Sequence, residues 1–158
     1  MKFMTLEKYD NSEDFELLGN DGQSIILSSY KNSKNVVLCF YPKNHLFACP
    51  SKKVFEMAKS VISVYTEIIA TETVVFAISV DSVDSQSKFV KEYQIPYLHL
   101  SDPKKIACKK YAGTNIAGLA KRSTFVIDKK GIIHDVIRAI NVVSHGQEIL
   151  DSLKKIKV

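Results

Sequence analysis

Short apolar runs alternate with amphipathic segments along this chain. Residues 36–40 and 74–80 are largely apolar and bounded by polar positions, which is typical of strands covered on both faces. Residues 51–69 instead place apolar side chains at the three- and four-residue spacing of an amphipathic helix, and the same spacing returns in residues 144–156. Strands that alternate with helices predict an α/β fold.

Turn-forming residues divide the rest of the chain into hairpins and single elements. Residues 19–22 read Gly-Asn-Asp-Gly between two short apolar segments, which predicts an N-terminal β-hairpin. Residues 128–131 predict a second hairpin between strands 123–127 and 132–137. The remaining predicted elements are helix 83–93, strand 97–100 and helix 104–111, which Ser101, Asp102 and Pro103 would cap and open. Together they predict a single domain over residues 1–158, with a central mixed sheet, helices on both faces and the N-terminal hairpin.

Composition narrows the function classes. The chain of 158 residues carries a net charge of +5, but its lysines are scattered in pairs, as on solvated faces, which argues against nucleic-acid binding. No apolar run approaches the roughly 20 residues of a membrane span, and the charged N-terminal segment lacks the apolar core of a signal peptide. We therefore expect a cytoplasmic protein that binds neither nucleic acid nor membrane.

The cysteines, histidines and glycines indicate no bound metal or cofactor. Three cysteines, none in Cys-x-x-Cys spacing, argue against a disulfide framework, and the four histidines do not group with them into a zinc site. The sequence has no glycine-rich phosphate loop. Cys39 lies inside a predicted buried strand and Cys108 inside a predicted helix, so we expect both to pack in the core.

Cys49 is the candidate reactive residue. It follows the predicted strand 36–40 by one loop and lies where the next predicted helix begins. The unpaired amide hydrogens of a first helical turn carry partial positive charge, which favours a thiolate over a thiol. Pro42 and Pro50 would make the chain rigid on both sides of the sulfur, as a preorganised nucleophile requires. The alternative is that Cys49 is a small buried apolar residue.

The segment from Tyr41 to Ser51 resembles the active-site loop of the peroxiredoxins, the alkyl hydroperoxide reductase / thiol-specific antioxidant superfamily. The family motif reads Pro, three residues, Thr or Ser, two residues, Cys, and Pro42 and Cys49 have that spacing. Other stretches are similar to the bacterioferritin comigratory protein (Q-type) subgroup: Val80-Asp81-Ser82, Phe89, Leu100-Ser101-Asp102, Tyr111 and residues 122–131. The resemblance covers most of the chain, residues 15–153, and implies a thioredoxin-like fold.

The resemblance implies a role for each of three residues. Cys49 would be the peroxidatic cysteine, which attacks a peroxide oxygen and becomes a sulfenic acid. Pro42 would shield the thiolate from solvent, and Arg122 would lower the thiol pKa and hold the peroxide oxygens. The permanent charge and rigid donor fork of arginine suit that task. The alternative is that Arg122 is an exposed surface residue beside Lys121.

Two residues depart from the family motif. Leu46 occupies the hydroxyl position and cannot hydrogen-bond a peroxide, and Lys52 stands where the family usually has a Glu that often orients the arginine. The usual resolving positions hold Val54 and residues 89–90 (Phe-Val), which leaves Cys108 as the only other candidate for a resolving cysteine.

The resemblance implies a one-cysteine peroxidase that reduces hydrogen peroxide or organic hydroperoxides. Its expected partners are the peroxide and a thioredoxin-like or small-thiol reductant, with the protein a monomer or a weak homodimer and no cofactor. Because of Leu46 and Lys52, the alternative is a peroxiredoxin fold that has lost turnover and serves as a redox sensor or binding protein.

Overall fold

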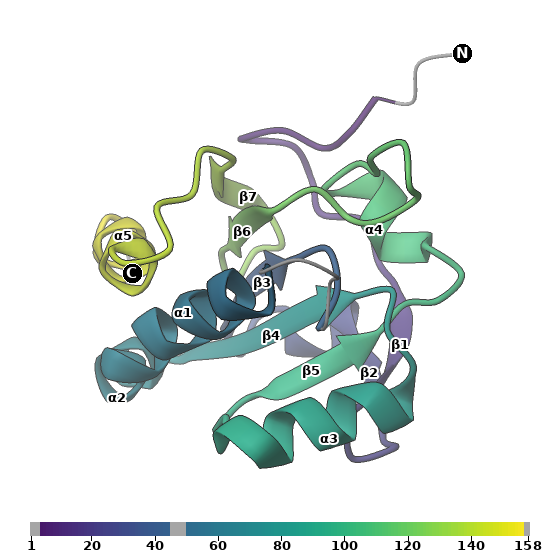
Figure 1. Cartoon of the computed structure of the whole chain (residues 1–158). Coiled ribbons are helices and arrows are strands. Elements are labelled where there is room, and N and C mark those ends of the chain that lie inside the picture. The colour runs from purple at the N-terminus through teal and green to yellow at the C-terminus, as the bar shows by residue number, and fades with distance from the viewer. Residues whose placement is uncertain (1–3, 45–49, 157–158) are drawn as a thin grey trace.

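The computed structural model describes residues 4–44 and 50–156, and within them seven strands form one sheet (Figure 1). The order across the sheet is β2-β1-β5-β4-β3-β6-β7. The strands are β1 Glu16–Gly19, β2 Ser24–Ile26, β3 Asn35–Phe40, β4 Thr73–Ser79, β5 Leu98–Ser101, β6 Ser123–Ile127 and β7 Ile133–Ile137. Strands β3, β4 and β5 are parallel, and the β1–β2 and β6–β7 pairs are antiparallel hairpins. The predicted mixed sheet and N-terminal hairpin are confirmed.

Five α-helices and one short 3-10 helix accompany the sheet in the described residues. They are α1 Pro50–Ser63, α2 Tyr65–Ile69, α3 Val83–Tyr93, α4 Ile106–Lys110, α5 His145–Lys154 and the 3-10 helix Leu27–Tyr30. Helix α3 has the predicted bounds, and it begins where the Ser82 hydroxyl accepts a hydrogen bond from the Ser85 N–H at 3.2 Å. None of these helices is long and apolar enough to cross a membrane.

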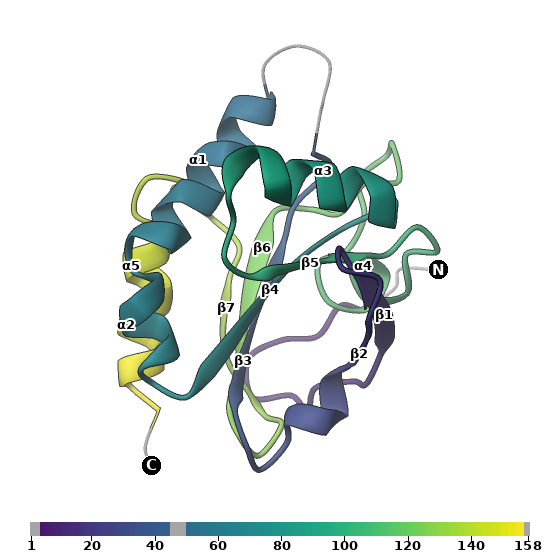
Figure 2. The ribbon, with the colours of Figure 1, turned by 90° about the horizontal axis from the view of Figure 1, so that it is seen from below.

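Side chains of β3 alternate between the two faces of the sheet. Val36, Leu38 and Phe40 join a core with α4 and the N-terminal hairpin, whereas Val37 and Cys39 join a second core with α1, α2, α3 and α5. Figure 2 shows α1, α2 and α5 gathered at one side of the sheet. Every residue of β3 is buried, so the predicted covering of both faces is confirmed.

The helix predicted over residues 51–69 is divided in two. Val64 leaves helical geometry between α1 and α2, with φ −121° and ψ 14°. The division lies close to the point where α5 approaches α1. There the Gly146 N–H donates to Ser60 Oγ at 2.8 Å. A Cβ at Gly146 would stand 2.2 Å from the Ser60 carbonyl oxygen. Only glycine fits this approach, and α5 therefore packs directly on the backbone of α1.

The helix predicted over residues 104–111 is shorter, and Pro103 does not open it. Helix α4 begins only at Ile106, because Lys105 takes a left-handed conformation with φ 60° and ψ 31°. Asp102 still caps the helix, since its carboxylate accepts hydrogen bonds from the N–H groups of Ile106 and Cys108, both at 2.8 Å. These bonds satisfy amide groups that have no partner inside the first turn.

The carboxyl ends of β3, β4 and β5 lie at one edge of the sheet. Tyr41 follows β3, Asp81 comes two residues after β4, and Asp102 follows β5. Polar side chains from three distant parts of the sequence are thus brought together. Ligands of open α/β sheets bind at this kind of edge, so it is the first place to look for a functional site.

Candidate active site

Arg122 stands at this edge, immediately before β6. The next residue, Ser123, pairs with Phe40 at the end of β3, so Arg122 lies beside the point where the chain leaves β3 toward Cys49. The Arg122 Nη1 donates to Sδ of Met57 on α1, at 3.6 Å. Arg122 is therefore half-buried against α1, which argues against the alternative of a freely exposed surface arginine.

The guanidinium of Arg122 pairs with no carboxylate of the described residues. The ion pairs found there join other cations to Glu7, Glu13, Glu72 and Asp84. Burial lowers the pKa of Arg122 from its ordinary value of 12.5, but an arginine side chain stays charged in proteins. A charged, half-buried guanidinium without an acidic partner is suited to bind an anion or a polarised oxygen.

His145 lies close to Arg122 and stays neutral. Burial, together with the charge of Arg122, lowers the pKa of His145 to about 4. The His145 Nε2 lies 2.8 Å from Oγ1 of Thr124, in a hydrogen bond between two buried side chains. His145 therefore adds no charge beside the guanidinium at neutral pH.

Pro42 is held between two anchored neighbours. The Tyr41 N–H donates to the Ile78 carbonyl oxygen at 3.1 Å, which extends the β3–β4 pairing by one bond. The Asn44 N–H donates to Oδ2 of Asp81 at 2.9 Å. Pro42 is itself half-buried, a position from which a rigid ring can limit the access of solvent to what it covers.

Cys49 and Leu46 lie outside the described residues, and of Lys52 only the helical backbone is described. Helix α1 begins at Pro50, the residue after Cys49, in agreement with the predicted helix start. The structure thus brings Pro42 and Arg122 to the same edge of the sheet. In the sequence, Cys49 lies between Pro42 and the start of α1.

The other two cysteines are core residues, as predicted. Cys39 and Cys108 are both buried and free. Burial raises the pKa of the Cys39 thiol to about 12, against a smaller opposing effect of its hydrogen bond with Thr124. Burial, assisted by the negative charge of Asp102, also raises the pKa of the Cys108 thiol. Neither sulfur is a thiolate near neutral pH, so neither is set up as a nucleophile.

We therefore expect Cys49 to be the only cysteine that oxidises readily. After limited treatment with hydrogen peroxide, mass spectrometry of a digest should find added oxygen at Cys49 while Cys39 and Cys108 remain thiols. A non-reducing digest should contain no disulfide between Cys49 and Cys108, because Cys108 is buried in α4. Equal oxidation of Cys108, or that disulfide, would contradict the prediction and indicate a two-cysteine enzyme.

A buried polar cluster at the same edge was not predicted from the sequence. Tyr41, Asn44, Asp81, Gln86 and His99 are all at most 6% exposed, and hydrogen bonds join them. Only the placement of Tyr41 and Asp81 after apolar strands hinted at it. The sequence pattern around Gln86 on α3 and around His99 in β5 does not mark either residue as part of a buried cluster.

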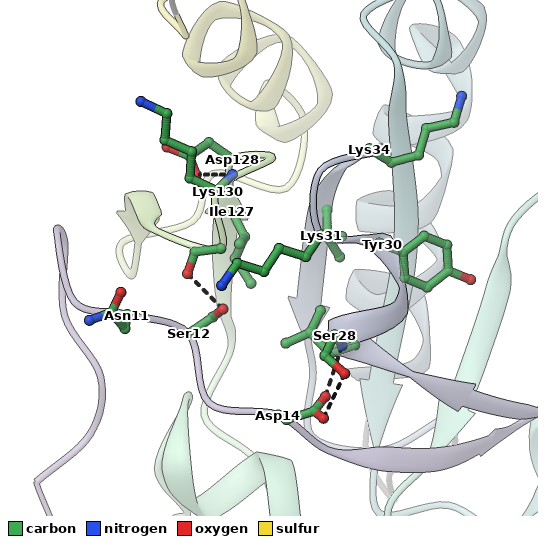
Figure 3. Close-up of a pocket in the computed structure, with 13 residues that line it drawn as sticks. Asn11, Ser12, Asp14, Ser28, Tyr30, Lys31, Lys34, Ile127, Asp128 and Lys130 are labelled. Carbon is green, nitrogen blue, oxygen red and sulfur yellow. Dashed lines mark hydrogen bonds between the residues drawn. The ribbon is translucent and has the colours of Figure 1, made fainter.

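A cavity of about 240 Å³ lies at the other end of the sheet (Figure 3). Val36 and Ile127 line it, and these residues pair at the start of β3 and the end of β6, away from Arg122. The carboxylate of Asp14 in its wall accepts two hydrogen bonds from Ser28, at 2.8 Å each. The cavity is therefore separate from the edge that holds Pro42 and Arg122.

No group of three or more histidine, cysteine, aspartate or glutamate side chains in the described ranges is arranged to hold a metal ion. In the described residues the candidate active site consists of Arg122 and Pro42. The buried polar cluster lies behind them, and the start of α1 lies beside them.

The sequence of this chain is similar to those of a known protein family. The model of the AhpC/TSA family matches residues 10–136. Peroxiredoxin Bcp of Bacillus subtilis is 33% identical over 159 aligned residues, which cover 96% of this chain and 97% of the relative. A putative peroxiredoxin bcp of Coxiella burnetii is 29% identical and covers 95% and 100% of the two chains.

Solved structures show the same fold. The crystal structure of the peroxidoxin BcpB of Mycobacterium tuberculosis superposes with a TM-score of 0.84 at 26% identity, over 97% of this chain and 99% of that one. A PrxQ structure of Xylella fastidiosa has a TM-score of 0.82 at 24% identity. The predicted thioredoxin-like fold is confirmed. From the family match and the Bcp relatives it follows that this chain belongs to the AhpC/TSA family, and within it to the Bcp and Q-type peroxiredoxins, a class of thiol-dependent peroxidases.

Proposed function

We propose that this protein reduces hydrogen peroxide or organic hydroperoxides with Cys49 as the peroxidatic residue. The thiolate sulfur would attack the terminal oxygen of the peroxide, so that an S–O bond forms while the O–O bond breaks. The leaving oxygen takes a proton and departs as water or an alcohol. Cys49 is oxidised to a sulfenic acid and the peroxide is reduced.

The observation that carries this proposal is the state of Arg122. A half-buried guanidinium, which pairs with no carboxylate in residues 4–44 and 50–156, stands at the edge where the chain leaves β3 toward Cys49. Its charge would stabilise the thiolate and so lower the thiol pKa. Its donors would also hold the peroxide oxygens, on which negative charge develops as the bond breaks. Pro42 would limit the access of water to the sulfur.

The burial of the other cysteines supports a one-cysteine cycle. The positions usual for a resolving cysteine hold Val54, which is buried on α1, and Val90, which is half-buried on α3. Neither residue has a thiol. An external thiol, thioredoxin-like or small, would attack the sulfenic acid to give a mixed disulfide and water. A second thiol would then release reduced Cys49 and a disulfide of the reductant.

The second candidate function is that of a redox sensor or binding protein without efficient turnover. It is favoured by Leu46 and Lys52, which replace a hydroxyl and an acidic residue of the family motif. In that case Cys49 would still be oxidised by peroxide, but slowly.

One experiment tests both candidates. The disappearance of Cys49 thiolate with hydrogen peroxide is followed by stopped-flow, and peroxide consumption is followed with dithiothreitol as the reductant. A thiol peroxidase should consume many equivalents of peroxide per chain, and Cys49→Ser should consume none above the dithiothreitol background. Oxidation of Cys49 without turnover would favour the sensor. Turnover that survives in Cys49→Ser would show that another residue is the nucleophile.

A further inference from the structure

Asn44, which ends the described range 4–44, is held by hydrogen bonds of both its backbone and its side chain. Its N–H donates to Asp81 Oδ2 at 2.9 Å. Its amide nitrogen Nδ2 donates to Gln86 Oε1 at 3.0 Å and to Ser85 Oγ at 3.1 Å, and its Oδ1 accepts from the Tyr41 hydroxyl at 2.6 Å. An asparagine at a loop position is usually exposed, whereas this one has an exposed fraction of 0%.

The hydrogen bonds around Asn44 have a fixed direction that starts at a backbone carbonyl. The Leu100 carbonyl can only accept, so Nε2 of Gln86 must face it, at 3.1 Å. Oε1 of Gln86 therefore faces Asn44 and accepts from its Nδ2, which leaves Oδ1 of Asn44 toward Tyr41. Neither amide can be turned over without breaking a bond at both of its ends.

The same direction fixes His99. The single hydroxyl proton of Tyr41 is directed at Oδ1 of Asn44 and Oε1 of Gln86, at 2.6 and 2.8 Å. His99 Nδ1, 2.9 Å from the Tyr41 oxygen, must then carry a hydrogen and donate it. Burial lowers the pKa of His99 to about 3, so the ring is neutral and its Nε2 carries no proton. The neutral tautomer of His99 with its hydrogen on Nδ1 is thus the one that fits these hydrogen bonds.

A second branch returns to the same glutamine. Gln86 Nε2 also donates to Ser79 Oγ at 2.9 Å, and the Ser79 hydroxyl donates to Asp81 Oδ2, the atom that accepts from the Asn44 N–H. Gln86 therefore holds Asn44 twice, through the side chain directly and through the backbone by way of Ser79 and Asp81. These hydrogen bonds form a closed ring of side chains, called the buried ring below, which joins α3 to the carboxyl ends of three parallel strands. Its members are Tyr41, Asn44, Ser79, Asp81, Gln86 and His99.

Stability alone does not account for this ring. Apolar side chains of similar size can replace a buried polar network at little or no loss of stability, whereas a network with one partner missing is costly. What such a network adds is one defined arrangement of the groups it joins, although Nε2 of His99 has no hydrogen-bond partner in the described part of the chain. Here those groups are Tyr41 and Asn44, which lie on either side of Pro42 in the sequence. Cys49 follows five residues after Asn44.

We propose that Tyr41 and Gln86 are positioning residues, which fix the segment from Tyr41 to Asn44 and with it Pro42, at the edge of the sheet that holds Arg122. The inference rests on the proposed function. It requires that a change at Tyr41 or Gln86 alters the chemistry of Cys49, although neither side chain would touch the peroxide.

The test compares two substitutions of the same kind. Tyr41→Phe removes a buried hydroxyl from the ring. Tyr111→Phe removes the hydroxyl of another buried tyrosine, which belongs to the other core and donates to the Glu13 carbonyl. The rate constant of each variant with hydrogen peroxide is measured, together with the rate of alkylation of Cys49 by iodoacetamide across pH. Alkylation of the folded protein reports on Cys49 because the other two cysteines are buried.

We expect Tyr41→Phe to lower the peroxide rate constant about tenfold, since small misplacements of a reacting group are costly, and to shift the pH midpoint of alkylation. Tyr111→Phe should change neither, even if both variants lose similar stability to urea. Equal effects of the two variants on Cys49 would overturn the proposal. If Tyr41→Phe does not fold, Gln86→Met, which keeps the length of the side chain, replaces it under the same two readouts.

The two readouts also separate this proposal from the proposed function. If the wild-type protein does not react with hydrogen peroxide, the proposed function fails. The alkylation profiles still decide whether Tyr41 controls the environment of the Cys49 thiol, and identical profiles for wild type and Tyr41→Phe would refute it.

Discussion

Replacing Arg122 with methionine should lower the rate constant for peroxide reduction by about 10²–10³-fold, the cost of removing one donor aimed at developing negative charge. The substitution removes the permanent charge and the fork of donors that the proposed function assigns to the thiolate and the peroxide oxygens. Methionine keeps an unbranched apolar stem, although the hydrogen bond from Nη1 to Sδ of Met57 is lost. The pKa of Cys49 should rise toward the ordinary thiol value of about 8.5.

Arg138 provides the matched control for this substitution. It is the only other arginine of the chain, and its Nη2 bonds Thr5, Leu6 and Glu7 at the surface, at 3.1–3.3 Å. Arg138→Met removes the same charge from the protein away from the candidate active site. Stopped-flow rates with hydrogen peroxide and the pH dependence of alkylation should separate the two variants. Equal rates would show that Arg122 does not act on the peroxide.

Restoring the family residues should raise the rate. We expect the double variant Leu46→Thr with Lys52→Glu to reduce hydrogen peroxide at least about tenfold faster than the wild-type protein. The threonine hydroxyl would supply the hydrogen bond that leucine cannot make, and an aligned donor is worth about 10²–10³-fold. Loss of the lysine charge would raise the thiol pKa, but full ionisation of an ordinary thiol gains at most roughly thirtyfold near pH 7. Alignment should therefore outweigh ionisation.

The single variant Leu46→Thr and a charge control complete that experiment. Lys53 is exposed on α1 beside Lys52, so Lys53→Glu makes the same change in net charge at a neighbouring position. The peroxide rate constant and the thiol pKa are measured separately for each protein. A rate that stays equal or falls in the double variant would indicate a working site of a different design, in which Leu46 takes part.

The hydrophobic pattern was sufficient to predict the sheet and most of the helices. β6 and α3 have the predicted bounds, and β3 is buried on both faces. Periodicity failed where a tertiary contact decided the local structure. The break at Val64 lies next to the approach of Gly146, and nothing within residues 51–69 signals that approach. The late start of α4 depends on the left-handed Lys105, a conformation that a lysine seldom takes.

The candidate site divides in the same way. Cys49, Pro42 and Arg122 could be selected from the resemblance to the peroxiredoxins, and the structure brings Pro42 and Arg122 to one edge. The buried ring behind them was missed because the bonds that join Tyr41 and Asn44 to the other elements connect residues 37 to 58 positions apart, from Asn44–Asp81 to Tyr41–His99. Polar residues such as Gln86 have no pattern in sequence that distinguishes a satisfied core amide from a solvated one.

The close approach of Gly146 to Ser60 makes the last helix a support for the first. Ile149, Leu150 and Leu153 of α5 fill the same core as Val61 of α1, and Gly146 lets the two backbones meet without an intervening side chain. A protein shortened before His145 would leave that side of α1 facing water. Loss of α5 by proteolysis, or its displacement by a fused tag, would thus destabilise α1, the helix that begins at the residue after Cys49.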